Sequence, residues 1–84
     1  MMDINYELYK VFYYVAISLS FSDASKQLFI SQSAVSQSIK VLEKKLGITL
    51  FIRSTKRVQL TPEGENILFA FKLIVGLCDR RELV

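Results

Sequence analysis

Apolar residues recur at helical spacing near the start of the chain. Steps of three or four residues separate Leu8, Phe12, Val15 and Leu19. This period predicts a helix from about Tyr6 to Ser18 that buries one stripe. Neighbouring tyrosines widen the stripe, and at this spacing aromatic side chains are more typical of a core than of a surface on which bases stack.

Two further helices follow the first. Ser22 is the predicted N-cap of a short second helix, and Ser31 is the predicted N-cap of a third helix over about 32–46. The apolar stripe of this third helix consists of Val35, Ile39, Leu42 and Leu46. Gly47 then lies where a left-handed helix cap is expected.

The period changes after residue 47. Two short segments rich in β-branched and bulky residues, 48–53 and 57–60, predict a small β-hairpin that turns near Ser54 and Thr55. A last helix begins after Thr61, because a capping hydroxyl followed by proline is a strong helix start. The predicted fold is therefore mainly α-helical with one small β-hairpin.

The last helix is apolar on most sides between Ile67 and Cys78. One small domain cannot cover such a helix completely, so we expect a partner to bury part of it.

The composition excludes several kinds of site. The 84 residues include no His and one Cys, which rules out a structural zinc site, a His-dependent acid–base site and a disulfide framework. No paired carboxylates, glycine-rich phosphate loop or nucleophile–base pair is recognisable, so we expect no catalysis, no metal and no cofactor. No signal peptide or membrane span is recognisable either, and we expect a cytoplasmic protein.

Positive charge is concentrated in the middle of the chain. The net charge is +3, but residues 22–60 contain seven cations and two acids, while both ends are mildly acidic. This distribution suits a polyanion, although charges that fell unevenly on a soluble surface would give the same count.

The third helix carries a polar face opposite its apolar stripe. The residues of this face are Ser33, Ser36, Gln37, Lys40 and Lys44. Gln can bond bidentately to adenine, Lys reaches phosphate or guanine, and short hydroxyls let a helix approach base edges. A short helix, a brief turn at 29–31 and such a helix are arranged as in a helix-turn-helix. The pattern favours DNA binding, and an ordinary solvated face is the alternative.

Short motifs also follow one another in a specific order. They are FSDASKQL at 21–28, ISQSAVSQSIK at 30–40, LE at 42–43, LG at 46–47, LFIR at 50–53 and LTPEG at 60–64. In this order and spacing they resemble the N-terminal DNA-binding domain of LysR-type transcriptional regulators, over about residues 6–71.

Three residues depart from the family's pattern. Leu19 stands where the family tends to place a small residue, usually Gly, and Ser33 stands where Pro is common. Gln37 replaces a residue that is often basic, and because it lies on the polar face it bears on base preference.

The resemblance implies a winged helix-turn-helix at 1–61, followed by a linker and dimerisation helix at 62–84. The third helix would enter the major groove of double-stranded DNA, and the hairpin at 50–60 would form a wing on the backbone or minor groove. The implied DNA-binding residues are Ser22, Gln32, Ser33, Ser36, Gln37, Lys40, Arg53, Thr55, Lys56 and Arg57. A salt bridge that holds the wing is the alternative role for Arg53.

The resemblance also implies a bacterial, homodimeric, sequence-specific regulator. The residues that would pair the two last helices are Ile67, Leu68, Phe71, Ile74, Val75 and Cys78. Family members continue into an effector-binding domain, so we expect the chain to stop before it and any small-molecule effector to bind there. The main alternative is a dimeric helical protein–protein interaction module without DNA binding.

Overall fold

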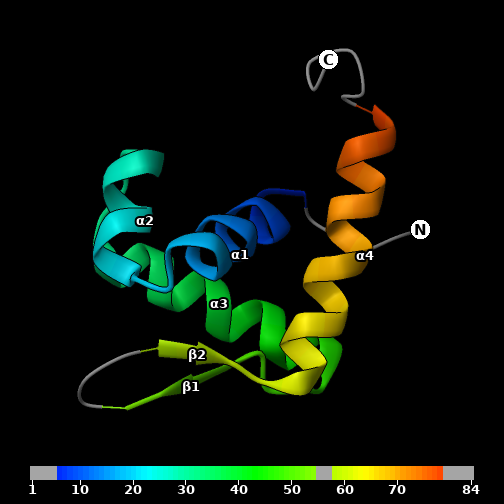
Figure 1. Ribbon diagram of the computed structural model, residues 1–84. Helices are drawn as coiled ribbons and strands as arrows, with labels where there is room; N and C mark the ends of the chain where they lie inside the picture. Colours follow the sequence, from blue (N-terminus) through cyan, green and yellow to red (C-terminus); the bar gives the residue numbers. More distant parts are fainter. Residues whose placement is uncertain (1–5, 55–57, 79–84) are drawn as a thin grey trace.

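The computed structural model describes residues 6–54 and 58–78, with side chains as far as residue 73 in the last helix. The elements, in order, are α1 (Tyr6–Ser18), α2 (Phe21–Leu28), α3 (Gln32–Leu46), β1 (Phe51–Arg53), β2 (Val58–Leu60) and α4 (Pro62–Cys78) (Figure 1). The prediction of a mainly helical fold with one β-hairpin is confirmed.

The three N-terminal helices enclose the core, and α4 stands beside them (Figure 1). Fully buried side chains between these helices include Phe12, Val15, Val35 and Ile39. The apolar stripes predicted for α1 and α3 are therefore confirmed, with one exception. Leu19 follows the end of α1 with a left-handed φ of 53°, which leaves it 43% exposed.

The start of α2 corrects a prediction. Its N-cap is Ser20 rather than Ser22, because the Ser20 side-chain oxygen accepts the backbone N–H of Asp23 at 3.0 Å. The left-handed Leu19 ends α1 and is followed at once by Ser20, whose extended backbone is the conformation that a cap requires. The spacing of Ser20 and Asp23 is itself a capping signal in the sequence.

Both caps predicted for α3 are confirmed. Ser31 accepts the N–H of Ala34 at 3.1 Å, and Gly47 adopts a left-handed φ of 72° at the other end. Phe29, in the turn before α3, has a φ of 59° and is 92% exposed. The turn therefore places phenylalanine in a conformation that glycine adopts without strain.

The two strands of the hairpin pair antiparallel, with Arg53 opposite Val58. β1 is shorter than the segment predicted at 48–53, because the backbone N–H of Leu50 donates to the Glu43 carboxylate instead of to a neighbouring strand. The hairpin is thereby bonded to α3 at the point where the chain leaves that helix.

Thr61 joins the hairpin to α4. Its hydroxyl donates to the carbonyl of Thr49 at 2.6 Å and accepts the N–H of Gly64 at 2.9 Å, which confirms the predicted helix start. Gly64 lies so close to the hairpin that a Cβ at this position would overlap the carbonyl oxygen of Leu50.

The first half of α4 packs against α1. Phe71 is 8% exposed and stacks on Tyr9, with ring centroids 6.0 Å apart and planes inclined by 12°. Phe69 and Leu73 of the same helix are 64% and 54% exposed. Among the described residues, no helix is both long and apolar enough to cross a membrane.

Candidate nucleic-acid interface

One side of α3 is polar and accessible to solvent. Gln32, Ser33, Gln37 and Lys40 are exposed, and Ser36 is half-buried. Val35 and Ile39, which alternate with them in the sequence, are fully buried. The helix therefore separates a core face from a face that is uncharged at its N-terminal end and cationic at Lys40.

The only acid of α3 is Glu43, which sequence reasoning treated only as a charge. Helical spacing puts Glu43 two turns beyond Ser36 on the same side of the helix. Its Oε2 accepts the N–H of Leu50 at 2.8 Å and the N–H of Phe51 at 3.3 Å. The one carboxylate on this side of α3 is thus hydrogen-bonded to the start of the hairpin, and the helix contains no acid between Gln32 and Lys40. No local sequence signal identifies this contact, since its partners are backbone groups.

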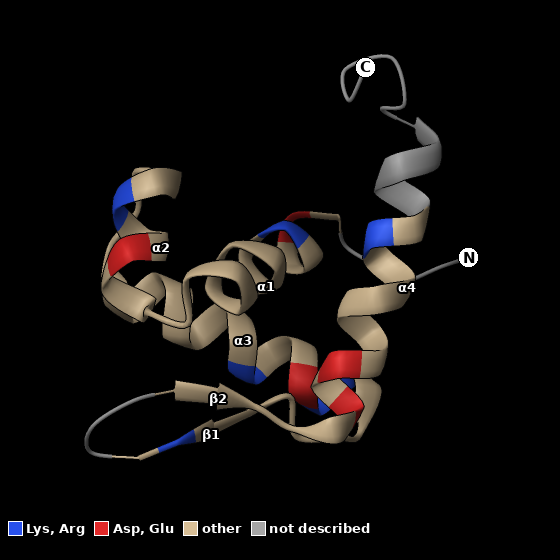
Figure 2. Cartoon of the chain, viewed as in Figure 1, with Lys and Arg blue, Asp and Glu red and all other residues tan. Residues whose placement is uncertain are grey.

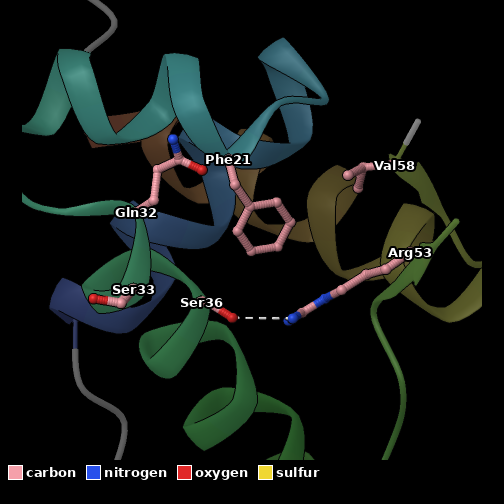
Figure 3. A pocket seen from close by; sticks show the side chains of 6 residues that line it. All are labelled: Phe21, Gln32, Ser33, Ser36, Arg53 and Val58. Atoms are coloured by element: carbon pink, nitrogen blue, oxygen red, sulfur yellow. Dashed lines mark hydrogen bonds between the residues drawn. The ribbon is translucent and has the colours of Figure 1, made fainter. Parts of the chain in front are cut away.

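Arg53 reaches from β1 to α3. Its Nη1 donates to the hydroxyl of Ser36 at 3.0 Å, and its Cζ lies 4.6 Å from the centroid of the Phe21 ring. Figure 3 shows the three side chains converging from the hairpin, α3 and α2. Within the described residues, these contacts hold Arg53, and no ion pair of Arg53 with a carboxylate is found there. In the described part of the chain, Arg53 thus contacts a hydroxyl and an aromatic ring.

These contacts close one side of an open hollow between α2, α3 and the hairpin (Figure 3). Its lining residues are Phe21, Gln32, Ser33, Ser36, Arg53 and Val58. Four of these six residues were predicted at the interface. Phe21 and Val58 were not, because sequence reasoning selected polar residues and the floor of the hollow is apolar.

Charged side chains of both signs lie around the hollow, since Arg53 lines it and Asp23 lies in the first turn of α2. Figure 2 shows cations on α3 and β1, a cation and an acid on α2, and acids in the first turn of α4. The acids of that turn are Glu63 and Glu65, and both are exposed. The cations Lys40 and Arg53 therefore both lie on elements that border the hollow.

The structure says less about the remaining predicted DNA contacts. Ser22 lies in the first turn of α2 and is half-buried, and its carbonyl accepts the hydroxyl of Ser25 at 2.7 Å. Thr55, Lys56 and Arg57 lie outside the described residues.

The residues predicted for dimerisation divide into two groups. Ile67 and Leu68 are half-buried against the core, and Phe71 is buried inside the same chain. The side chains of Ile74, Val75 and Cys78 lie outside the described part. Among the described side chains of α4, the large apolar ones that remain exposed are Phe69 and Leu73, one helical turn apart, and the sequence did not predict either for dimerisation.

A sequence model described as "Bacterial regulatory helix-turn-helix protein, lysR family" matches residues 6–65. The chain belongs to the LysR family. The match confirms the resemblance drawn from the short motifs and covers α1 through the first turn of α4.

Characterised members of the LysR family resemble the chain over its N-terminal part. The transcriptional regulator DsdC of Escherichia coli is 49% identical over 53 residues, which is 63% of this chain and 17% of DsdC. The transcriptional activator AmpR of Pseudomonas aeruginosa is 43% identical over 68 residues, 76% of this chain and 23% of AmpR. The chain spans about a fifth of the length of the curated relatives that it matches.

Solved structures of the LysR family share the fold. The CbnR DBD in complex with DNA superposes with a TM-score of 0.83 at 29% identity, covering 94% of this chain and 91% of that one. The BenM DBD bound to the catB site 1 DNA gives a TM-score of 0.81 at 31% identity, covering 95% and 90%. Full-length OxyR C199D from Pseudomonas aeruginosa gives 0.79 at 32% identity, covering 95% and 28%. The predicted winged helix-turn-helix architecture is confirmed.

Proposed function

We propose that this chain binds double-stranded DNA with sequence preference, as the DNA-binding domain of a bacterial transcriptional regulator. α3 enters the major groove, and the β1–β2 hairpin lies on the backbone or minor groove. The proposed DNA-binding unit is 1–61, and the segment 62–84 links it to its twin in a homodimer. The regulator acts in the cytoplasm and catalyses no reaction.

The observation that carries this proposal is the exposed part of α3. From Gln32 to Lys40 the exposed side chains are amides, hydroxyls and one cation, and the guanidinium of Arg53 is added from the hairpin. Amides and hydroxyls discriminate base edges, whereas cations mainly neutralise phosphates. A surface that served only for solubility would not require an acid-free stretch from Gln32 to Lys40.

The comparisons support the same function. The CbnR and BenM structures that superpose on nearly the whole chain are complexes with DNA. The relatives DsdC and AmpR are named as transcriptional regulators, a class without catalytic activity of its own.

Dimerisation through α4 is supported by the surface that this helix leaves uncovered. Phe69 and Leu73 are exposed one turn apart, although α4 also packs on α1 through Phe71. Apolar side chains grouped in this way favour contact with another chain. The proposed pairing uses Phe69 and Leu73 in addition to the residues predicted from the sequence. A small-molecule effector would bind a separate domain of the intact regulator.

Fluorescence anisotropy with a mixed-sequence duplex over a series of salt concentrations tests DNA binding. Affinity should fall steeply with salt, with a log–log slope of about −0.9 for each phosphate neutralised. Lys40→Gln should make this slope shallower by about 0.9 for each protomer bound, which is about 1.8 for the proposed homodimer. The matched variant Lys72→Gln removes an exposed cation of α4 and should leave the slope unchanged.

The result also separates the two functional classes. Absence of binding at low salt would refute the DNA-binding proposal. A dimeric chain that failed to bind would then favour the protein–protein interaction module.

A further inference from the structure

The hydrogen bond between Arg53 and Ser36 has a defined direction. A guanidinium carries only donors, so the Ser36 oxygen must be the acceptor of the 3.0 Å bond from Arg53 Nη1. The hydroxyl proton of Ser36 is consequently not used in this contact. It is the one remaining donor of the side chain.

Two other serines on helices of this chain use that proton internally. Ser18 donates to the carbonyl of Tyr14 at 2.9 Å, and Ser25 donates to the carbonyl of Ser22 at 2.7 Å. A serine hydroxyl within a helix commonly donates to a backbone carbonyl of the preceding turn in this way. Ser36 makes no such bond within the described part of the chain, so its proton is available on the side of the hollow.

The position of Arg53 is itself determined by an aromatic ring. Its guanidinium lies 4.6 Å above the centroid of Phe21, within the range of a cation–π interaction. Phe21 contacts the buried ring of Phe51 edge to face at 6.2 Å, and Phe51 packs on Phe12 in the core at 5.5 Å. A series of packed rings therefore connects the guanidinium to the buried core.

We propose that Arg53 and Phe21 position Ser36 as a hydrogen-bond donor toward DNA. This inference rests on the proposed function and assigns Arg53 a role in base preference in addition to its charge. A donor in the major groove pairs with purine N7, guanine O6 or thymine O4, and it disfavours the amino groups of adenine and cytosine. Arg53 is thus a positioning residue that acts through Ser36.

Four variants test the proposal after selection of a preferred duplex with the unmodified chain. Dissociation constants are measured for that duplex and for each single-base-pair change, with Ser36→Ala, Arg53→Lys, Phe21→Leu and the double variant Ser36→Ala/Arg53→Lys. Lysine keeps the charge of Arg53 but lacks the planar fork that bonds and stacks at the same time.

Arg53→Lys should lower discrimination about 3- to 10-fold at one base-pair position, the effect of one hydrogen bond. Ser36→Ala should lower discrimination at the same base-pair position. The double variant should match Ser36→Ala alone, because both substitutions remove the same contact between Ser36 and the base. The salt dependence with mixed-sequence duplex should stay as in the unmodified chain for Arg53→Lys, since the charge is retained. Phe21→Leu should act at the same base pair with a smaller effect.

A measurement on the free protein checks the positioning without DNA. The ring current of Phe21 should shift the side-chain N–H resonance of Arg53 upfield in the NMR spectrum, and Phe21→Leu should abolish this shift. Circular dichroism of each variant confirms that it remains folded.

The outcomes distinguish failure of DNA binding from failure of the positioning role of Arg53. No binding of any duplex by the unmodified chain refutes the proposed function. If the unmodified chain binds and Arg53→Lys weakens all duplexes equally, or if Ser36→Ala and Arg53→Lys affect different base pairs, the positioning role is refuted alone. An Arg53 resonance without the upfield shift in the unmodified chain refutes it as well.

Discussion

Phe29 is the residue at which a substitution should stabilise the chain. It caps the C-terminal end of α2 with φ of 59° and ψ of 41°, and its backbone N–H is bonded to the preceding turn. In this left-handed conformation the Cβ of any L-residue crowds the backbone carbonyl, whereas glycine has no Cβ. The Phe29 ring is 92% exposed, so its removal sacrifices almost no burial. Phe29→Gly should therefore relieve strain at little cost.

The magnitude follows from two opposing terms. The left-handed conformation costs about 1–2 kcal/mol for a residue with a Cβ. Glycine loses more conformational freedom on folding than other residues, which offsets about 0.5–1 kcal/mol of the relieved strain. A net stabilisation of about 0.5–1 kcal/mol remains, which corresponds to a rise in melting temperature of about 2–8 °C for a domain of this size.

Thermal and urea unfolding, followed by circular dichroism at one protein concentration, measure this effect. A fixed concentration is needed because the stability of a dimer depends on it. Phe29→Ala is the matched control, since it removes the ring but keeps the Cβ and the strain, and its stability should stay near that of the unmodified chain. The reasoning is wrong if Phe29→Ala stabilises the chain as much as Phe29→Gly does, or if Phe29→Gly destabilises it.

Three further substitutions test the contacts that place the hairpin and the helix face. Glu43→Ala should lower the free energy of unfolding by about 1.5–3 kcal/mol in urea titrations, because two backbone N–H groups lose a charged acceptor; an equal loss for the exposed Glu63→Ala would contradict this. Gly64→Ala should cost about 1–3 kcal/mol in the same assay, since the added methyl group meets the carbonyl oxygen that precedes β1, and unchanged stability would show that α4 can move away from the hairpin. Gln37→Ala should cost about 1–3 kcal/mol in binding to a preferred duplex and change the base preference, whereas equal weakening with every duplex would remove Gln37 from the reading face.

Local sequence patterns were sufficient for most of the helices. The stripes of α1 and α3, and the caps at Ser31 and Gly47, depend on residues within one or two turns of each other. The N-cap of α2 was misplaced, although the spacing of Ser20 and Asp23 signals it, because the left-handed turn at Leu19 that sets the start of the helix was not predicted. Leu19 occupies the position at which the family tends to have glycine, and its positive φ gives the physical reason for that tendency.

The candidate site was predictable only where it follows the helical period. The exposed residues of α3 were identified because a helix with one buried face must present the opposite face to solvent. The contact of Arg53 with Ser36 spans 17 residues, and Phe21 is further away still in the sequence. No pattern along the chain indicates that the three side chains meet. The apolarity of α4 likewise could not distinguish Phe71, which packs on α1, from Phe69, which is exposed.

The charge of the interface illustrates why composition alone was an incomplete guide. The residue count gives the middle of the chain an excess of cations. Two contacts in the folded chain determine which of these charges lie on the polar face of α3. The carboxylate of Glu43, on the same side of α3 as Ser36, is bonded to backbone N–H groups of the hairpin. The guanidinium of Arg53, from the same hairpin, lies against the uncharged N-terminal half of that side. The hairpin therefore donates hydrogen bonds to the acid of α3 and supplies a cation to the polar face of the same helix. Its position relative to α3 controls both the charge and the hydrogen-bonding pattern of the surface that we propose meets DNA.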